Sequence, residues 1–158
     1  MSSQLHVSIE CDDDFSLFDM RVWQPKDMAA LLALFGAAAP RIGTFARQGA
    51  RAAIGITPSR AMLLVESGHE RPSSDIEIGA VIDVSHGYRR FVLAGQSVAD
   101  RIGSMTGLDT DMAHMPVPSA TFTGIHSIAI LVLREAEDRF ALFAPTSYAE
   151  SLMEWLER

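Results

Sequence analysis

The sequence predicts an α+β fold with mixed, mainly antiparallel sheets and about three packed helices. Several short runs of β-branched and large apolar residues are separated by glycine, proline or charged residues, a pattern typical of antiparallel hairpins. Three other stretches carry apolar residues at helical spacing. Because strands and helices occur in mixed order along the chain, the α+β class is favoured.

The length of 158 residues suits one domain with one core. We expect residues 1–15 to form a weakly ordered N-terminal tail, because Asp12, Asp13 and Asp14 place three like charges side by side and nothing periodic precedes them. Residues 16–158 are then expected to form a single domain.

Composition and charge argue against several classes of function. The net charge of -7 and the scattered arrangement of only 13 lysines and arginines argue against nucleic-acid binding. The longest nearly apolar runs, residues 28–40 and 128–133, are too short to cross a bilayer of about 30 Å. A single cysteine, Cys11, and an N-terminus without the pattern of a secretory signal favour a cytoplasmic protein. Hydrophobic residues make up 48% of the chain, so part of its apolar surface is expected to serve a partner.

Local patterns predict the elements of the first half. Residues 16–23 alternate well enough to form a strand. Asp27 is expected to cap a helix over residues 28–38, whose leucines make an apolar face. Residues 52–56 and 61–65 are two apolar runs separated by a turn that contains proline, which predicts a hairpin.

Residues 79–95 form the central unit of the predicted fold. Residues 80–85 and 90–94 have the composition of two strands, joined in a hairpin whose Gly87 passes through positive φ. Directly afterwards, Ser97 is expected to be the N-cap of a second helix.

The last third is predicted to contain more strands. Residues 121–123 and 128–133 are expected to pair around Gly124, residues 134–139 to form a charged turn, and residues 140–144 to form the final strand.

The chain closes on a predicted helix over residues 146–156. Its Tyr148, Leu152, Trp155 and Leu156 recur at helical spacing and are expected to make one buried stripe.

The residues alone reveal no catalytic constellation. Asp83, Ser85 and His86 are the residue types of a hydrolytic triad, but neighbours along a strand point to opposite faces and cannot form a relay among themselves. The five histidines lack metal-binding spacing, and Cys11 cannot nucleate a structural zinc site. We therefore assign no catalytic, cofactor-binding or metal-binding residue to this chain.

Two other patterns are interpreted structurally. Asp109 and Asp111 resemble the opening of a calcium loop, but the glycine and glutamate that complete such a loop are missing, so these residues are interpreted as turn residues. Gly95-Gln96-Ser97 could offer backbone N–H groups to an anion, although any capped helix after a strand has this form.

Several motifs follow one another from the middle of the chain to its end: Asp83-Val84-Ser85, Leu93-Ala94-Gly95, Leu108-Asp109, Met115-Pro116, and a closing helix with Ser147-Tyr148-Ala149, Leu152, Trp155 and Leu156. In this order and spacing they resemble the gamma subunit family of heterotetrameric sarcosine oxidase, over residues 50–158. The sequence departs from the family pattern at residues 59–62, which replace a tryptophan and acidic residues, and at Gln96, which replaces a proline.

The resemblance implies an aminomethyltransferase-like, folate-binding fold and an accessory, non-catalytic role. It implies that the partners are larger alpha and beta subunits, which carry FAD, FMN, NAD and tetrahydrofolate, and that this chain carries no cofactor. Such a complex oxidatively demethylates sarcosine to glycine and transfers the one-carbon unit to tetrahydrofolate.

Two alternatives stay open. The chain is otherwise a stand-alone folate-binding or aminomethyltransferase-like protein, in which Asp83 or Asp109 pairs with the pterin amine. The departures from the family pattern also allow a subunit of a related N-methyl amine oxidase or dehydrogenase.

Overall fold

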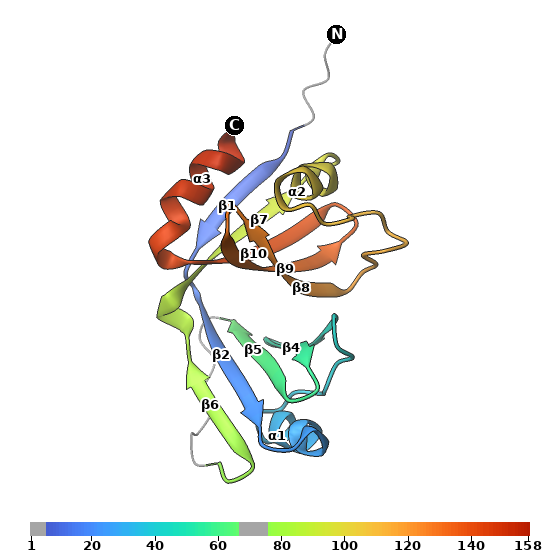
Figure 1. Ribbon diagram of the computed structural model, residues 1–158, viewed down its shortest axis with the longest axis vertical. Coiled ribbons are helices and arrows are strands. Elements are labelled where there is room, and N and C mark those ends of the chain that lie inside the picture. Colours follow the sequence, from blue (N-terminus) through green and yellow to red (C-terminus); the bar gives the residue numbers. More distant parts are fainter. Residues whose placement is uncertain (1–5, 67–75) are drawn as a thin grey trace. The chain divides into compact units, whose positions relative to one another are not determined.

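The structure, a computed structural model, describes residues 6–66 and 76–158. These residues form two compact units, each built on its own five-stranded antiparallel sheet (Figure 1). Unit 2 spans Asp14–Ser85, and unit 1 combines the described residues up to Asp13 with His86–Arg158. The sequence predicts one domain over residues 16–158, and within the described residues each unit has a hydrophobic core of its own.

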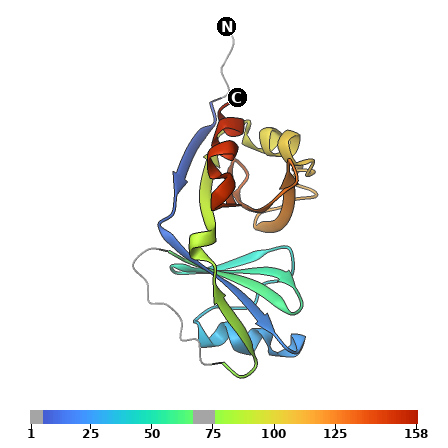
Figure 2. The ribbon, with the colours of Figure 1, turned by 60° about the vertical axis from the view of Figure 1, so that its left-hand side comes forward.

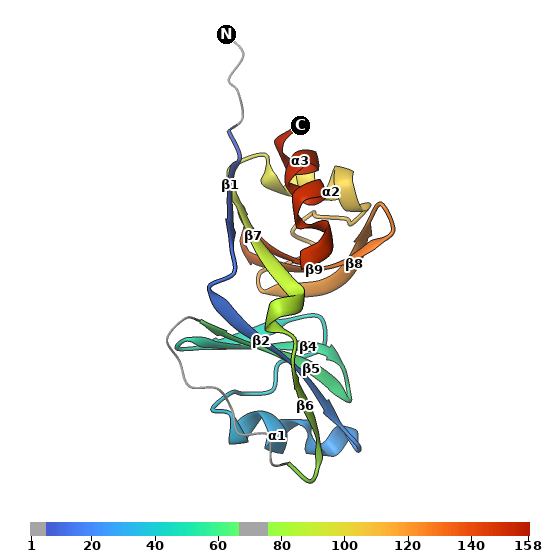
Figure 3. The same ribbon diagram turned by 90° about the vertical axis from the view of Figure 1, so that its left-hand side faces the viewer.

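The sheet of unit 2 has the spatial order β3-β4-β5-β2-β6. Its strands are β2 (Phe15–Val22), β3 (Phe45–Gln48), β4 (Arg51–Thr57), β5 (Arg60–Glu66) and β6 (Gly79–Asp83). These strands confirm the first predicted strand and the predicted hairpin of β4 and β5. A short 3₁₀ turn, η1 (Pro25–Asp27), leads into α1 (Met28–Leu34), which lies against one face of the sheet (Figure 3). The core between them consists of Phe18, Met20, Val22, Met28, Leu31, Leu32, Phe35, Ala37, Ala53, Ala61, Leu63 and Val65.

Helix α1 ends earlier than predicted because a glycine terminates it. Gly36 has a φ of +68°, in the left-handed region that favours glycine. Its N–H donates to the Ala33 carbonyl at 3.1 Å, and the Ala37 N–H donates to the Leu32 carbonyl at 3.0 Å. These are the two hydrogen bonds of a Schellman motif. Asp27 occupies the N-cap position as predicted, but its side chain makes no capping hydrogen bond.

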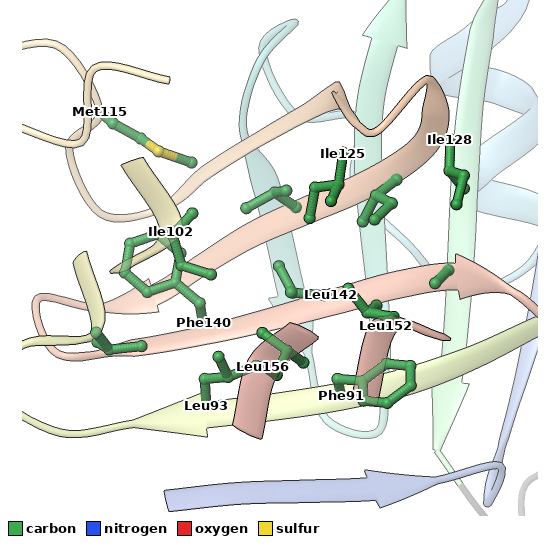
Figure 4. Packing of buried hydrophobic residues seen from close by; sticks show 14 residues of the cluster. Phe91, Leu93, Ile102, Met115, Ile125, Ile128, Phe140, Leu142, Leu152 and Leu156 are labelled. Carbon is green, nitrogen blue, oxygen red and sulfur yellow. The ribbon is translucent and has the colours of Figure 1, made fainter. Parts of the chain in front are cut away.

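The sheet of unit 1 has the spatial order β1-β7-β10-β9-β8. Its strands are β1 (Ser8–Asp12), β7 (Tyr88–Ala94), β8 (Ser119–Ile125), β9 (Ile128–Ala136) and β10 (Arg139–Pro145). Two helices pack on the same face of this sheet: α2 (Val98–Thr106) and α3 (Ala149–Glu157). The 3₁₀ turn η3 (Thr146–Tyr148) directly precedes α3. Figure 4 shows the contact, in which sheet residues meet helix residues: Phe91, Leu93, Phe140 and Leu142 with Ile102, Leu152 and Leu156.

The closing helix is confirmed, and most of its predicted apolar stripe faces the core. Leu152 and Leu156 are buried, and Trp155 packs against the same cluster. Tyr148 is 47% exposed, so its place in the buried stripe was predicted wrongly. It lies in η3, before the first turn of α3, where helical spacing does not hold.

The expected N-terminal tail contains a strand. β1 pairs antiparallel with β7 along the edge of the unit 1 sheet, with Cys11 opposite Phe91 and Asp12 opposite Arg90 (Figure 2). The Arg90 guanidinium donates to both carboxylate oxygens of Asp12, at 2.9 to 3.2 Å. Like-charge repulsion in the acidic run is thus relieved at Asp12 by a forked ion pair. Residues 1–5 of the expected tail lie outside the described residues.

Strands β6 and β7 do not form the predicted hairpin. β6 pairs with β2 in unit 2, and β7 pairs with β1 and β10 in unit 1. A single 3₁₀ turn, η2 (Ser85–Gly87), joins the two strands, and Gly87 is not among the described glycines with positive φ. The hairpin prediction was wrong because sequence adjacency of two strands does not establish that they pair.

The turn between β8 and β9 lies at His126 and Ser127 and not at the predicted Gly124. Their φ angles are 46° and 69°, and Gly124 is within β8. A two-residue hairpin loop with positive φ at both residues is normally built from Asn-Gly or Gly-Gly, because a side chain is strained there. The His126 ring packs on the Trp155 ring with their centroids 4.3 Å apart, a contact that helps to hold the strained turn.

Arg134 is buried in a strand, although residues 134–139 were predicted to form a charged turn. β9 extends through it to Ala136, and only 2% of Arg134 is exposed. Its guanidinium donates to three backbone carbonyls, those of Thr110 at 2.6 Å, Met115 at 2.9 Å and Glu137 at 2.8 Å.

The strain at Ser127 gives a first prediction. Ser127→Gly should raise the free energy of unfolding by about 0.5–1 kcal/mol, because glycine adopts the left-handed conformation without steric cost. Urea denaturation of the purified variant measures the change. As a control, Ser104→Gly on the exposed side of α2 should lower the stability by a similar amount, since glycine is a poor helix former. A Ser127→Gly protein less stable than the wild type would contradict the strain argument.

The carbonyls bound by Arg134 give a second prediction. Arg134→Met should cost about 2–4 kcal/mol, because three carbonyl groups lose their donor and methionine offers none. Urea denaturation tests the cost, and hydrogen exchange should be faster at residues 107–118. Arg139→Met on the neighbouring strand, where the arginine is exposed, should change the stability by less than about 1 kcal/mol. Equal effects of the two substitutions would refute the role assigned to Arg134.

Candidate functional site

Asp83 and Ser85 contact each other, but in a structural arrangement. Asp83 Oδ1 accepts hydrogen bonds from the Ser85 hydroxyl at 2.5 Å and from the Ser85 N–H at 3.0 Å. The buried Ser85 Oγ in turn accepts the backbone N–H of Leu17 at 2.9 Å. His86 is exposed, and its carbonyl accepts the Thr146 hydroxyl at 2.9 Å. The serine oxygen is thus used to hold β2, and within the described residues no hydrogen bond joins it to the imidazole.

Asp109 and Asp111 act as turn residues, in agreement with the structural interpretation. Asp109 Oδ1 accepts the N–H of Asp111 at 3.1 Å, and Asp111 Oδ1 accepts the N–H of Ala113 at 2.8 Å. The other oxygen of Asp109 lies 2.8 Å from His114 Nδ1, and both side chains are well exposed. Their oxygens therefore bond within the loop, in the pattern of Asx turns.

The backbone at Gly95, in the segment Gly95-Gln96-Ser97, is in contact with other parts of the chain. The Gly95 N–H donates to the Asp138 carbonyl at 2.9 Å, and a Cβ on Gly95 would lie 2.4 Å from the His6 carbonyl oxygen. Close approach of the backbone therefore requires this glycine. Ser97 occupies the N-cap position of α2 without a side-chain capping bond. The anion-binding interpretation of this segment receives no support from these contacts.

An ionic cluster on β2 and β5 was not predicted from the sequence. The buried carboxylate of Asp19 receives Arg60 in a fork, with Nε at 3.0 Å from Oδ1 and Nη2 at 3.2 Å from Oδ2. Arg21 adds a third contact at 3.3 Å. Arg60 belongs to the segment that departs from the family pattern, and it serves here to neutralise a buried carboxylate. Only the pairing of the two strands brings these residues together.

Unit 2 contains a small, largely apolar cavity of about 210 Å³. Met28, Ile42 and Pro58 contribute apolar walls, and Lys26 and Arg60 contribute the charged groups. Arg60 is paired with Asp19. Lys26, the other cation of the lining, has no ion pair within the described part of the chain.

Unit 1 contains a larger cavity of about 320 Å³ between β1, β7 and the first turn of α3. Its apolar lining includes Phe91 and Met153, and its charged lining consists of Arg89 and Glu150. The single cysteine, Cys11, lies in its wall and is exposed. This volume lies at the lower end of the range of about 300–1,000 Å³ for small-molecule sites.

Within residues 6–66 and 76–158, no group of three or more His, Cys, Asp or Glu side chains could hold a metal ion. In the same residues, no helix is long and apolar enough to cross a membrane.

The role of Ser85 gives a third prediction. Ser85→Ala should lower the free energy of unfolding by about 1–3 kcal/mol, because the buried N–H of Leu17 loses its acceptor. His86→Ala should have an effect below about 0.5 kcal/mol, because the imidazole is exposed. Chemical denaturation of both variants compares the two. A stable Ser85→Ala protein would show that the hydroxyl is free for another role.

No family model matches the chain, and no curated protein matches it in sequence. Solved structures do match. A chain of the heterotetrameric sarcosine oxidase from Corynebacterium sp. U-96, solved in complex with pyrrole 2-carboxylate, aligns with a TM-score of 0.81 and 21% identity, over 98% of this chain and 84% of that chain. The glycine cleavage system aminomethyltransferase T from Bartonella henselae aligns with a TM-score of 0.68 and 14% identity, over 98% of this chain and 46% of that chain.

The present chain therefore spans about half the length of the aminomethyltransferase. At these levels of identity the similarity establishes the fold. The α+β prediction is confirmed, and the chain has the fold shared by a chain of heterotetrameric sarcosine oxidase and by part of an aminomethyltransferase.

Proposed function

We propose that this chain is an accessory, non-catalytic small (gamma) subunit of a heterotetrameric sarcosine oxidase-like flavoenzyme. One observation carries the proposal: the match to a chain of such an enzyme extends over 98% of this chain and 84% of that chain. The two chains therefore correspond over nearly their whole lengths, which supports an equivalent place in an assembly. The motifs from Asp83 to Leu156 support the same family.

In the proposed complex, sarcosine is oxidatively demethylated to glycine, and the one-carbon unit passes to tetrahydrofolate. FAD, FMN, NAD and tetrahydrofolate bind to the larger alpha and beta subunits. The contacts of Asp83 and Asp109 agree with this division of roles. Each of these carboxylates accepts hydrogen bonds within its own loop, so neither is arranged to receive a pterin amine.

The partner surface that we propose for unit 2 includes Trp23. This residue is 67% exposed, yet its indole N–H donates to the Glu77 carbonyl at 3.0 Å and its backbone N–H donates to the Ile78 carbonyl at 3.1 Å. A large ring that is held in place and exposed loses little conformational freedom on binding. Tryptophan is also among the residues that contribute most to interfaces. Leu34, Ile42 and Ile82 are further exposed apolar side chains of this unit.

A second candidate function is a stand-alone folate-binding or aminomethyltransferase-like protein. The TM-score of 0.68 to an aminomethyltransferase favours it. The chain spans only 46% of that protein, which makes this function the weaker candidate. A subunit of a related N-methyl amine oxidase differs from the first proposal in its substrate, and a subunit of a dehydrogenase differs also in the electron acceptor.

Co-expression with the larger flavin-bearing subunits of the same organism tests the proposal. The tagged chain should retain a yellow complex that oxidises sarcosine, and Trp23→Ala should lower the yield of complex about tenfold or more while the thermal stability of the chain is unchanged. Trp23→Phe keeps an apolar ring and should give an intermediate yield.

Tyr148→Ala, a second exposed aromatic residue, serves as the matched control and should leave the yield unchanged. An equal loss with both variants would contradict the role of Trp23. A colourless monomer whose thermal stability rises with tetrahydrofolate would overturn the subunit proposal in favour of the second candidate. If the complex oxidised another N-methyl amine in place of sarcosine, the proposed substrate would be wrong and the proposed subunit role would stand.

A further inference from the structure

We propose that the cavity of about 320 Å³ in unit 1 binds a small zwitterion with an apolar body, of the α-amino acid class. This inference concerns a site within one unit of this chain and does not depend on the proposed subunit role.

The charged lining of the cavity is the first argument. Arg89 and Glu150 both line it, yet neither forms an ion pair or a hydrogen bond through its side chain with any described residue. The other arginines of the same sheet behave differently: Arg90 is paired with Asp12, Arg139 with Glu135, and Arg134 donates to three carbonyls. A cation and a carboxylate that share a cavity without pairing are both available to a ligand.

The two charges together select the class of ligand. A simple carboxylate gains from Arg89 but is repelled by Glu150, and a simple amine is attracted by Glu150 but repelled by Arg89. A molecule that carries both an ammonium and a carboxylate gains from both side chains. Its carboxylate can face Arg89 and its ammonium can face Glu150, so each charge of the ligand has an opposite charge beside it.

The remaining lining fixes the body of the ligand. The apolar part of the lining consists of Phe91, Ala149 and Met153, and the flexible side chain of Met153 adapts to irregular apolar shapes. The cavity volume suits a molecule of amino-acid size. An α-amino acid with an aliphatic side chain meets all three requirements of charge, polarity and size.

Strand pairing explains how the cavity arises. Cys11 stands opposite Phe91 in the ladder of β1 and β7, and Arg89 lies on the same face of β7, two residues before Phe91. Glu150 and Met153 come from the first turns of α3. The cavity is thus built from regular elements and not from a loop.

The position of Cys11 allows a direct test. It is the only cysteine of the chain and lies in the cavity wall, so a bound ligand should block its modification. The purified full-length chain is treated with iodoacetamide, a neutral reagent, and the alkylated fraction is followed by intact-protein mass spectrometry. L-leucine is the probe, and 4-methylpentanoate and 3-methylbutylamine lack its ammonium and its carboxylate, respectively.

L-leucine should slow the alkylation in a saturable manner, and the two analogues should protect at least tenfold more weakly. Arg89→Gln and Glu150→Gln should each raise the half-protecting concentration of leucine about tenfold or more. Because a changed charge alters the intrinsic reactivity of the thiol, protection is expressed as the ratio of rates with and without leucine for each variant. Arg139→Gln and Glu157→Gln, which lie outside the cavity lining, are the matched controls and should bind leucine as the wild type does.

Three outcomes with the purified chain alone would overturn the proposal. They are a failure of all three compounds to protect Cys11, equal protection by leucine and 4-methylpentanoate, and undiminished protection in both cavity variants. Protection that appears only when partner subunits are added would also overturn it, because the cavity would then receive a protein side chain. Glu150 is exposed, so Glu150→Gln should fold normally, and circular dichroism checks this.

Discussion

Arg134 introduces a full positive charge into the interior of unit 1, and three backbone carbonyls from two segments of the chain converge on it. No ion pair to Arg134 occurs in the described part of the chain, so these carbonyls and the ring of Phe140, 5.0 Å from the guanidinium carbon, must offset the cost of burying the charge. Because Thr110 and Met115 belong to the irregular stretch after α2, the guanidinium also determines the course of that stretch. A loop with little regular structure is thereby attached to β9, an interior strand of the sheet next to the edge strand β8.

A second constraint acts at the opposite edge of the same sheet. Unit 1 is formed from two segments that are distant in the sequence, and β1 joins the sheet only by pairing with β7. The fork between Asp12 and Arg90 adds a charged contact to this ladder. Cys11 and Phe91 stand opposite each other in the same register, which brings the thiol into the cavity wall. The cavity therefore depends on the pairing of β1 with β7, which places Cys11 in its wall.

Local patterns in the sequence predicted most elements, and their failures share a physical cause. The strands at residues 16–23 and 140–144 and the closing helix were predicted correctly because their apolar spacing reports directly on burial. The hairpin around Gly87 was predicted wrongly because composition identifies strands but not their partners. Arg134 was predicted in a charged turn because charged residues are rarely buried, and its three carbonyl partners and the Phe140 ring make its burial tolerable.

The candidate site was less predictable than the fold for the same reason. Asp83 and Asp109 attracted attention as acidic residues near turns, and residues of this kind usually bond to their own backbone, as both do here. Arg89 and Glu150 carried no signal, because no motif connects them and only the packing of α3 on the sheet makes them line one cavity. Side chains already bonded within their own loops have little left to offer a ligand. Charged side chains that the tertiary structure places in one cavity without pairing them, as it does Arg89 and Glu150, are the groups that can bind a ligand.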